Sequence, residues 1–139
     1  KSLSKSTDNA QSWKVVQKVW VEDMVESDGV LLATGQKGIM RSTDGGENWE
    51  WVISEGGVGI AIEQIQHGFA AIAYNAQTKS RRIHISKDTG KTWQTLEGLP
   101  SSASISSIKQ VGRYLLCGHP DGIFRSSDLG KSWTRVHSS

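Results

Sequence analysis

The feature that most constrains this chain is an eight-residue motif, S-x-D-x-G-x-x-W, which occurs three times. It reads STDGGENW at residues 42–49, SKDTGKTW at 86–93 and SSDLGKSW at 126–133. A degenerate copy, STDNAQSW, lies at residues 6–13, where Ala10 replaces the glycine. The motif aspartates follow one another at intervals near 40 residues. A period of this length indicates that one supersecondary unit is repeated along the chain.

The segments around each motif predict β-strands. The motif is preceded by GIMRS, RIHIS or GIFRS and ends in WEWV, WQTL or WTRV. Alternating apolar residues between Gly, Asp and Ser clusters are typical of hairpin strands. Two more strands per unit are predicted from the apolar runs at 15–25, 29–35, 59–66, 68–75, 104–111 and 113–119. No segment predicts a helix. Each unit is therefore four antiparallel strands, and radial repetition of such sheets makes a β-propeller.

The motif resembles the Asp-box, or BNR repeat, of sialidases, sortilin-type receptors, xyloglucan-degrading glycosidases and the photosystem II stability/assembly factor family. The wording GVLLATGQKGIMRSTDGGENWEW, residues 29–51, is most similar to the assembly-factor and sortilin-like propellers. The resemblance implies a structural motif, whose Asp accepts backbone hydrogen bonds in the turn and whose Trp packs on the hairpin. The residues given this role are Asp8, Trp13, Ser42, Asp44, Gly46, Trp49, Ser86, Asp88, Gly90, Trp93, Ser126, Asp128, Gly130 and Trp133.

Counting strands divides the 139 residues into about three full blades and one half blade. The expected boundaries are a partial blade at 1–16 and blades at 17–53, 54–97 and 98–139. Propellers typically close with about 4–8 blades, so this sequence alone is not expected to close a ring. Either it is a piece of a longer propeller, the interpretation we favour, or several chains assemble. Two copies would supply roughly seven blades' worth of strands.

Composition describes a soluble globular chain, with 36% hydrophobic and 22% charged residues. No run approaches the ~18 apolar residues of a membrane span. The 16 Lys and Arg residues are scattered and the net charge is +2, which does not suggest nucleic-acid binding. Cys117 is the one cysteine, so an internal disulfide and a Cys-based zinc cluster are excluded. The sequence predicts no metal or cofactor. An exported, periplasmic or extracellular location follows only from the family resemblance.

An enzymatic interpretation has limited support. Sialidase-like hydrolysis needs an arginine cluster, a Tyr–Glu nucleophile pair and an acid/base carboxyl group. Arg41 and Arg125 hold the same position in the repeat, which favours a packing role, and the R-I-P signature of sialidases is absent. The acidic stretch VEDMVESD, residues 21–28, could supply paired carboxylates or be a solvated cluster. GHPDG, residues 118–122, could hold a His–Asp dyad, but Pro and Gly there favour a turn.

Binding is expected on the face opposite the motif turns. Loops between second and third strands are predicted at 35–38, 74–82 and 118–122, and loops between blades at 54–58 and 97–104. They form a modestly cationic rim, suited to an acidic protein or an anionic glycan, or else ordinary solvated loops. The candidate rim residues are Lys37, Tyr74, Lys79, Arg81, Arg82, His119 and Asp121. We therefore predict a non-catalytic binding or assembly module; the alternative is a sialidase-like or xyloglucanase-like glycoside hydrolase.

Overall fold

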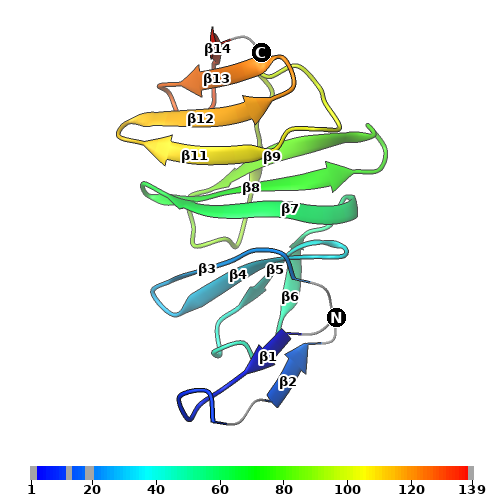
Figure 1. The fold of residues 1–139 in the computed structure, drawn as a ribbon, viewed down its shortest axis with the longest axis vertical. Coiled ribbons are helices and arrows are strands. Elements are labelled where there is room, and N and C mark those ends of the chain that lie inside the picture. Colours follow the sequence, from blue (N-terminus) through cyan, green and yellow to red (C-terminus); the bar gives the residue numbers. More distant parts are fainter. Residues whose placement is uncertain (1–2, 12–13, 18–20, 138–139) are drawn as a thin grey trace.

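The structure is a computed structural model of the chain, which describes residues 3–11, 14–17 and 21–137. Within these ranges the chain is all-β, with fourteen strands and no helix. Three four-stranded antiparallel sheets and one two-stranded hairpin follow one another along the long axis of the molecule (Figure 1). This is the blade arrangement that the repeat predicts.

The hairpin and the three sheets are each continuous in sequence. The hairpin comprises β1 (Leu3–Lys5) and β2 (Lys14–Gln17). The first sheet comprises β3 (Met24–Ser27), β4 (Val30–Gly35), β5 (Gly38–Ser42) and β6 (Glu50–Ile53). The second sheet comprises β7 (Gly56–Ile65), β8 (Gly68–Asn75), β9 (Ser80–Ser86) and β10 (Gln94–Thr95). The third sheet comprises β11 (Ser107–Val111), β12 (Tyr114–His119), β13 (Gly122–Ser126) and β14 (Thr134–His137).

Each sheet has the same strand order, and each motif connects its third strand to its fourth. The run at 15–25, predicted as one strand, is divided between β2 and β3, because residues 14–17 pair with β1 instead. The predicted loop at 54–58 is shorter than expected, since β7 already begins at Gly56. The exact division of the chain into blades stays a prediction.

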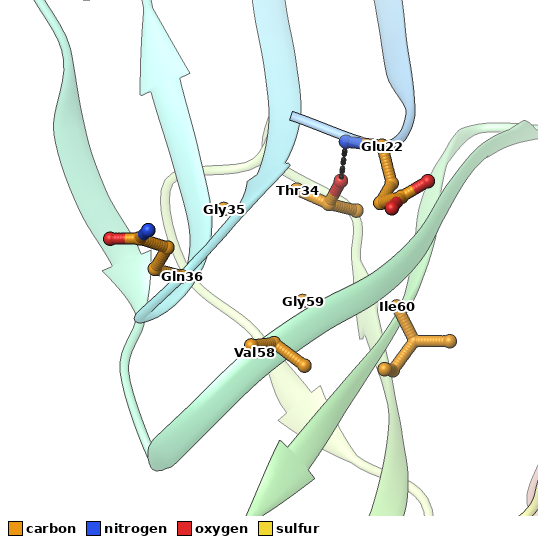
Figure 2. A pocket seen from close by; sticks show the side chains of 7 residues that line it. All are labelled: Glu22, Thr34, Gly35, Gln36, Val58, Gly59 and Ile60. Atoms are coloured by element: carbon orange, nitrogen blue, oxygen red, sulfur yellow. Dashed lines mark hydrogen bonds between the residues drawn. The ribbon is translucent and has the colours of Figure 1, made fainter. Parts of the chain in front are cut away.

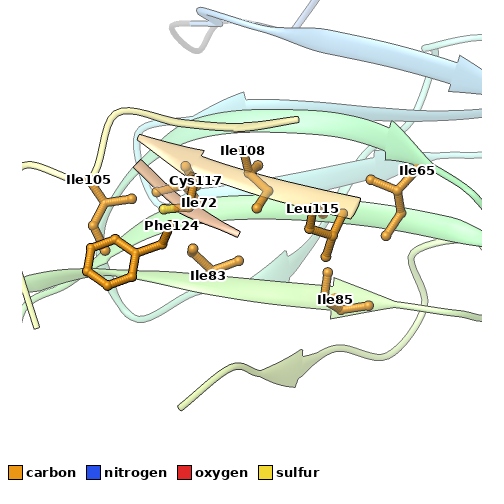
Figure 3. Packing of buried hydrophobic residues seen from close by; sticks show 10 residues of the cluster. Ile65, Ile72, Ile83, Ile85, Ile105, Ile108, Leu115, Cys117 and Phe124 are labelled. Carbon is orange, nitrogen blue, oxygen red and sulfur yellow. The ribbon is translucent and has the colours of Figure 1, made fainter. Parts of the chain in front are cut away.

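The hydrophobic core lies between the sheets. One buried cluster joins the first and second sheets and contains Val30, Leu32, Ile39, Ile53, Ile62, Phe69, Ala71 and Ala73. A second cluster joins the second and third sheets (Figure 3) and contains Ile65, Ala70, Ile72, Ile83, Ile85, Ile105, Ile108, Leu115, Cys117 and Phe124. Burying one such aliphatic side chain contributes roughly 1.5–3 kcal/mol. Stability therefore depends on docking one sheet against the next.

Glycines let the first and second sheets approach closely. A Cβ atom on Gly59 of β7 would lie 2.2 Å from the carbonyl oxygen of Gly38, at the start of β5. Gly38 itself has a φ of 135°, which a residue with a side chain rarely adopts. A side chain at either position would separate the sheets or distort the turn.

A buried arginine also joins these two sheets. The Nε atom of Arg41, in β5, donates to the carbonyl oxygen of Thr89 at 3.0 Å, and its Nη2 lies 3.4 Å from Thr89 Oγ1. Thr89 belongs to the motif turn of the second sheet. The Arg41 side chain is only 8% exposed, so these bonds compensate for its loss of hydration. This is the packing role that the position of Arg41 in the repeat predicts.

We predict that Arg41→Ala lowers the free energy of unfolding by about 1–3 kcal/mol, because it removes a charged hydrogen bond and leaves the Thr89 carbonyl without this donor. The matched control is Arg135→Ala, which truncates an exposed arginine of β14 and should change stability by less than about 0.5 kcal/mol. Urea denaturation of both variants measures the difference. Equal losses would contradict this role for Arg41.

Candidate functional site

The motif turns are closed hydrogen-bonded structures. In the first full copy, Ser42 Oγ donates to Asp44 Oδ1 at 2.8 Å and accepts the Gly46 N–H at 3.0 Å. Asp44 Oδ1 also accepts the Asn48 N–H at 2.9 Å, while its Oδ2 accepts from Asn48 Nδ2 at 2.7 Å. Trp49 Nε1 donates to the Gly46 carbonyl oxygen at 2.8 Å. Both carboxylate oxygens are thus occupied inside the turn.

The other two full copies repeat this arrangement. The Asp88 carboxylate accepts the N–H and hydroxyl of Thr92, and the Asp128 carboxylate accepts those of Ser132. These hydrogen bonds to the charged form lower the pKa of Asp88 and Asp128 to about 2, as those from Asn48 do for Asp44. These pKa values and hydrogen bonds favour ionised carboxylates held inside the turns; their structural role stays a prediction.

The degenerate copy keeps the turn conformation. Ser6 Oγ donates to Asp8 Oδ1 at 2.9 Å and accepts the Ala10 N–H at 2.9 Å, as in the full copies. Ala10 has a φ of 70°, in the left-handed region that the motif glycines occupy elsewhere. Trp13, predicted to be part of this copy, lies outside the described residues.

The opposite face carries the turns between second and third strands. These turns occupy residues 36–37, 76–79 and 120–121, at the ends of β5, β9 and β13 away from the motifs. Lys37, Lys79 and Asp121 are exposed there, as the sequence predicts for rim residues. Their contribution to binding stays a prediction.

The middle turn is shorter than the predicted loop at 74–82. Tyr74 pairs with Arg81, and Ala73 pairs with Arg82, within the β8–β9 ladder. The side-chain oxygen of Asn75 accepts two backbone N–H groups of the turn, from residues 77 and 78, at 2.9 and 2.8 Å. This local hydrogen bonding closes the hairpin early, so Tyr74, Arg81 and Arg82 are strand residues.

The two arginines of β9 contact the segments that connect neighbouring sheets. Arg81 Nη1 donates to the carbonyl oxygen of Ile105 at 2.8 Å, and the Arg81 N–H donates to that of Ser102 at 2.7 Å. Arg82 Nη1 lies 3.7 Å from Glu55 Oε2. Both guanidinium groups therefore hold neighbouring segments together, in addition to any contact with a ligand.

His119, which the sequence predicts as a rim residue, lies at the predicted turn, but its side chain is buried. Its Nδ1 accepts the Asp121 N–H at 3.0 Å, so Nε2 carries the proton toward the Pro100 carbonyl oxygen at 2.9 Å. The side chain is 2% exposed, and its ring packs edge-on against Phe124. The GHPDG segment forms the predicted turn, and His119 fixes that turn to the segment that enters the third sheet.

No sequence pattern pointed to the buried His84 of β9. Its Nδ1 lies 3.1 Å from Thr95 Oγ1, and its Nε2 lies 3.2 Å from Glu55 Oε1 but out of hydrogen-bond alignment. Burial lowers the pKa of His84, against the opposing effect of the nearby Glu55 carboxylate. The imidazole is buried between Thr95 of β10 and Glu55 in the segment that joins β6 to β7, which suits a structural group more than a catalytic one.

A pocket of about 250 Å³ lies between the first and second sheets, on the face opposite the motif turns (Figure 2). Its walls are mostly apolar, and the small residues on both sides leave the space open. The lining residues are Glu22, Thr34, Gly35, Gln36, Val58, Gly59 and Ile60. The sequence predicts loops in the two segments that meet here, 35–38 and 54–58, but not the pocket that their docking creates.

Residues of the acidic stretch at 21–28, near this pocket, make different hydrogen bonds. Thr34 Oγ1 accepts the N–H groups of Glu22 and Asp23 at 3.0 and 2.9 Å, which fixes the backbone at the pocket wall. Asp23 Oδ2 accepts the Ile62 N–H of the second sheet at 3.2 Å. Glu26 Oε2 accepts the Gly29 N–H at 2.9 Å within its own hairpin. Of the described residues that line the pocket, Glu22 is the one carboxylic acid.

A second pocket, of about 290 Å³, lies between β9 and residues 96–105, the segment that leads from the second sheet to the third. Its lining is more polar and includes Arg81, Arg82 and Glu97. Across the described part of the chain, no three His, Cys, Asp or Glu residues gather as a metal site. Those residues likewise form no helix long and apolar enough to cross a membrane.

No family model and no curated protein matches this chain. Among solved structures, it is similar to an ancestral GH74 enzyme, with a TM-score of 0.73 and 18% identity over 96% of this chain and 21% of that one. It is also similar to YCF48 bound to a D1 peptide, with a TM-score of 0.61 and 16% identity over 96% of this chain and 47% of that one. The chain thus spans between a fifth and a half of these proteins. At these identities the likeness shows the fold, which is that of β-propeller blades.

We predict that Ala10→Gly raises the free energy of unfolding by about 0.5–1 kcal/mol, because glycine relieves the left-handed strain at this position at some cost in chain entropy. Thr7→Gly, in the same turn but without a positive φ, is the control and should not stabilise. Thermal and urea unfolding compare the two. Stabilisation by both substitutions would argue against the strain.

The motif carboxylates predict a pH dependence. Each has a pKa lowered to about 2 in the folded chain, so its stabilisation is complete above its ordinary pKa of 3.8 and is lost as pH falls toward 2. The stability difference between the unaltered chain and Asp44→Asn should therefore shrink over this interval. Urea unfolding from pH 5 to about pH 2 measures it, and a constant difference would contradict the assignment.

Proposed function

We propose that this chain is part of an Asp-box propeller and acts as a non-catalytic binding or assembly module. Further blades, from a longer chain or from another subunit, would complete the ring. The binding surface is the face opposite the motif turns, and the partner is a protein or a glycan. An exported location fits the family resemblance.

The pocket between the first and second sheets is the observation that carries this proposal. It combines apolar walls, from Val58 and Ile60, with the carboxylate of Glu22. The motif aspartates, by contrast, use both carboxylate oxygens inside their turns. A surface that joins an apolar recess to one charged group is suited to recognition.

The size and charge of the pocket favour a peptide. Its volume of about 250 Å³ is below the roughly 300 Å³ at which small-molecule sites begin, and it suits a single side chain. A Lys or Arg side chain would place its apolar stem on Val58 and Ile60 and its charge beside Glu22. The exposed Lys37 and Lys79 at neighbouring turns would attract acidic residues elsewhere in the same peptide. The structural neighbour YCF48, bound to a D1 peptide, is a protein of this fold with a peptide ligand.

A displayed library of random peptides, selected on the intact chain, tests the proposal. We expect selected peptides with one basic residue near acidic ones, and an affinity about tenfold lower in Glu22→Gln or in the double variant Lys37→Glu, Lys79→Glu. The double variant Lys87→Glu, Lys131→Glu, at exposed positions on the motif face, is the control with the same change in charge as the double lysine variant and should bind within twofold. Failure to select any peptide, or equal losses in the control, would contradict the proposed surface.

Glycoside hydrolysis is the second candidate, and the likeness to an ancestral GH74 enzyme favours it. Hydrolysis of this kind ordinarily uses two carboxyl groups about 5–9.5 Å apart, whereas Glu22 is the one acid among the described lining residues of the pocket. Release of reducing sugar from xyloglucan or sialosides, abolished in Glu22→Gln, would establish the enzyme. Binding of such glycans without hydrolysis would favour the module.

A further inference from the structure

The segment that leads from the second sheet to the third is fixed against β9. It comprises residues 96–105 and is called the strap here. Two backbone hydrogen bonds tie it to the strand. The Leu96 N–H donates to the Ile83 carbonyl oxygen at 2.8 Å, and the Ser102 carbonyl oxygen accepts the Arg81 N–H at 2.7 Å. The strap is therefore attached to β9 on both sides of its middle part.

The pocket of about 290 Å³ lies between the strap and β9. Its volume is just below the roughly 300 Å³ at which small-molecule sites begin, so it suits a ligand smaller than most of these molecules. The third sheet also holds the strap, because His119 Nε2 donates to the Pro100 carbonyl oxygen at 2.9 Å. A wall that is fixed before binding loses little conformational freedom when a ligand enters.

Two opposite charges line this pocket, one on each wall. Arg81 belongs to β9 and Glu97 to the strap. Arg81 Nη1 donates to the Ile105 carbonyl oxygen, which leaves further N–H groups of the guanidinium for a ligand. Neither Arg81 nor Glu97 forms an ion pair with another residue that the structure describes. Arg82, also in the lining, already lies 3.7 Å from Glu55 Oε2. The charges of Arg81 and Glu97 can therefore both pair with a ligand.

A ligand that pairs with both charges has to carry an anionic and a cationic group. A simple anion would be attracted by Arg81 and repelled by Glu97, and a simple cation would experience the reverse. An α-amino acid carries both groups on one carbon atom. Its planar carboxylate matches the donors of a guanidinium group, and its ammonium group donates to a carboxylate. The apolar residues of the lining favour an aliphatic side chain; they are Ile83, Leu96, Leu99, Pro100 and Ile105.

We infer that the pocket between the strap and β9 binds a free aliphatic α-amino acid. Arg81 donates to its carboxylate, Glu97 accepts from its ammonium group, and its side chain packs on the apolar residues of the lining. The inference goes beyond the proposed peptide pocket and does not depend on further blades, because every residue that it uses belongs to the second sheet or to the strap.

A heteronuclear NMR titration of the intact chain with isoleucine tests the inference. We expect a dissociation constant below about 1 mM, with the largest shifts at residues 78–83 and 96–105. N-acetylisoleucine lacks the ammonium group and isoleucinamide lacks the carboxylate. Each should bind at least about tenfold more weakly, because each leaves one charge of the pocket without a partner. Absence of isoleucine binding would overturn the inference, and so would equal binding of N-acetylisoleucine, which would indicate a site for a carboxylate alone.

Substitutions at the two charges test the role of each. Glu97→Gln should weaken isoleucine binding at least about tenfold and leave the affinity for N-acetylisoleucine within about twofold, because that ligand has no ammonium group to lose its partner. Arg81→Gln should likewise weaken isoleucine binding and leave isoleucinamide within about twofold. Arg81→Gln also removes the hydrogen bond to Ile105, so urea unfolding checks its fold. Glu97 is exposed, so Glu97→Gln decides the matter if Arg81→Gln does not fold.

The matched control is Glu22→Gln, which makes the same chemical change in the pocket between the first and second sheets. It should leave isoleucine affinity within about twofold, and Glu97→Gln should leave the affinity for selected peptides within about twofold. Equal losses of isoleucine affinity in Glu22→Gln and Glu97→Gln would contradict the inferred site. Peptide binding without isoleucine binding would overturn this inference alone, and the reverse result would contradict only the proposed peptide surface.

Discussion

The hydrogen-bonded motif turn is the interaction on which the rest of this structure depends. Each carboxylate ties a serine hydroxyl and a backbone N–H together, which fixes the connection between third and fourth strands. A fixed turn presents its carbonyl groups in one direction, and Arg41 uses such a carbonyl at Thr89. A local sequence motif therefore sets the long-range contact between neighbouring sheets.

Docking of the sheets in turn creates the candidate site. Because Gly59 has no side chain, β7 lies close to the backbone at Gly38. The pocket beside Glu22 lies next to this close contact. Thr34 holds the Glu22 backbone at its wall. The same junction thus supplies stability through its buried cluster and a recess for a ligand at one edge.

Much of the fold could be predicted from the sequence, because the motif fixes the register of each hairpin and apolar alternation marks the strands. The position of the turns between second and third strands, on the face opposite the motifs, could be predicted from hairpin geometry. What could not be predicted depended on contacts across sheets or within single turns. Asn75 shortened the turn before Arg81, and His119 turned inward because Pro100 offers its carbonyl. The pocket forms only where two sheets meet, so no single segment of the sequence predicted it.

The residue before each motif serine differs from junction to junction, and this difference disfavours incorrect stacking of the sheets. Lys5 lies 3.5 Å from Glu47, Arg41 donates to Thr89, and Ile85 lines a recess together with Leu129. Stacking the sheets out of order would set Arg41 against Leu129, whose side chain has no hydroxyl group for Arg41 Nη2, so the buried guanidinium would lose one acceptor. Near-identical repeats therefore make different contacts at each junction, and these contacts favour one sequential order of the sheets.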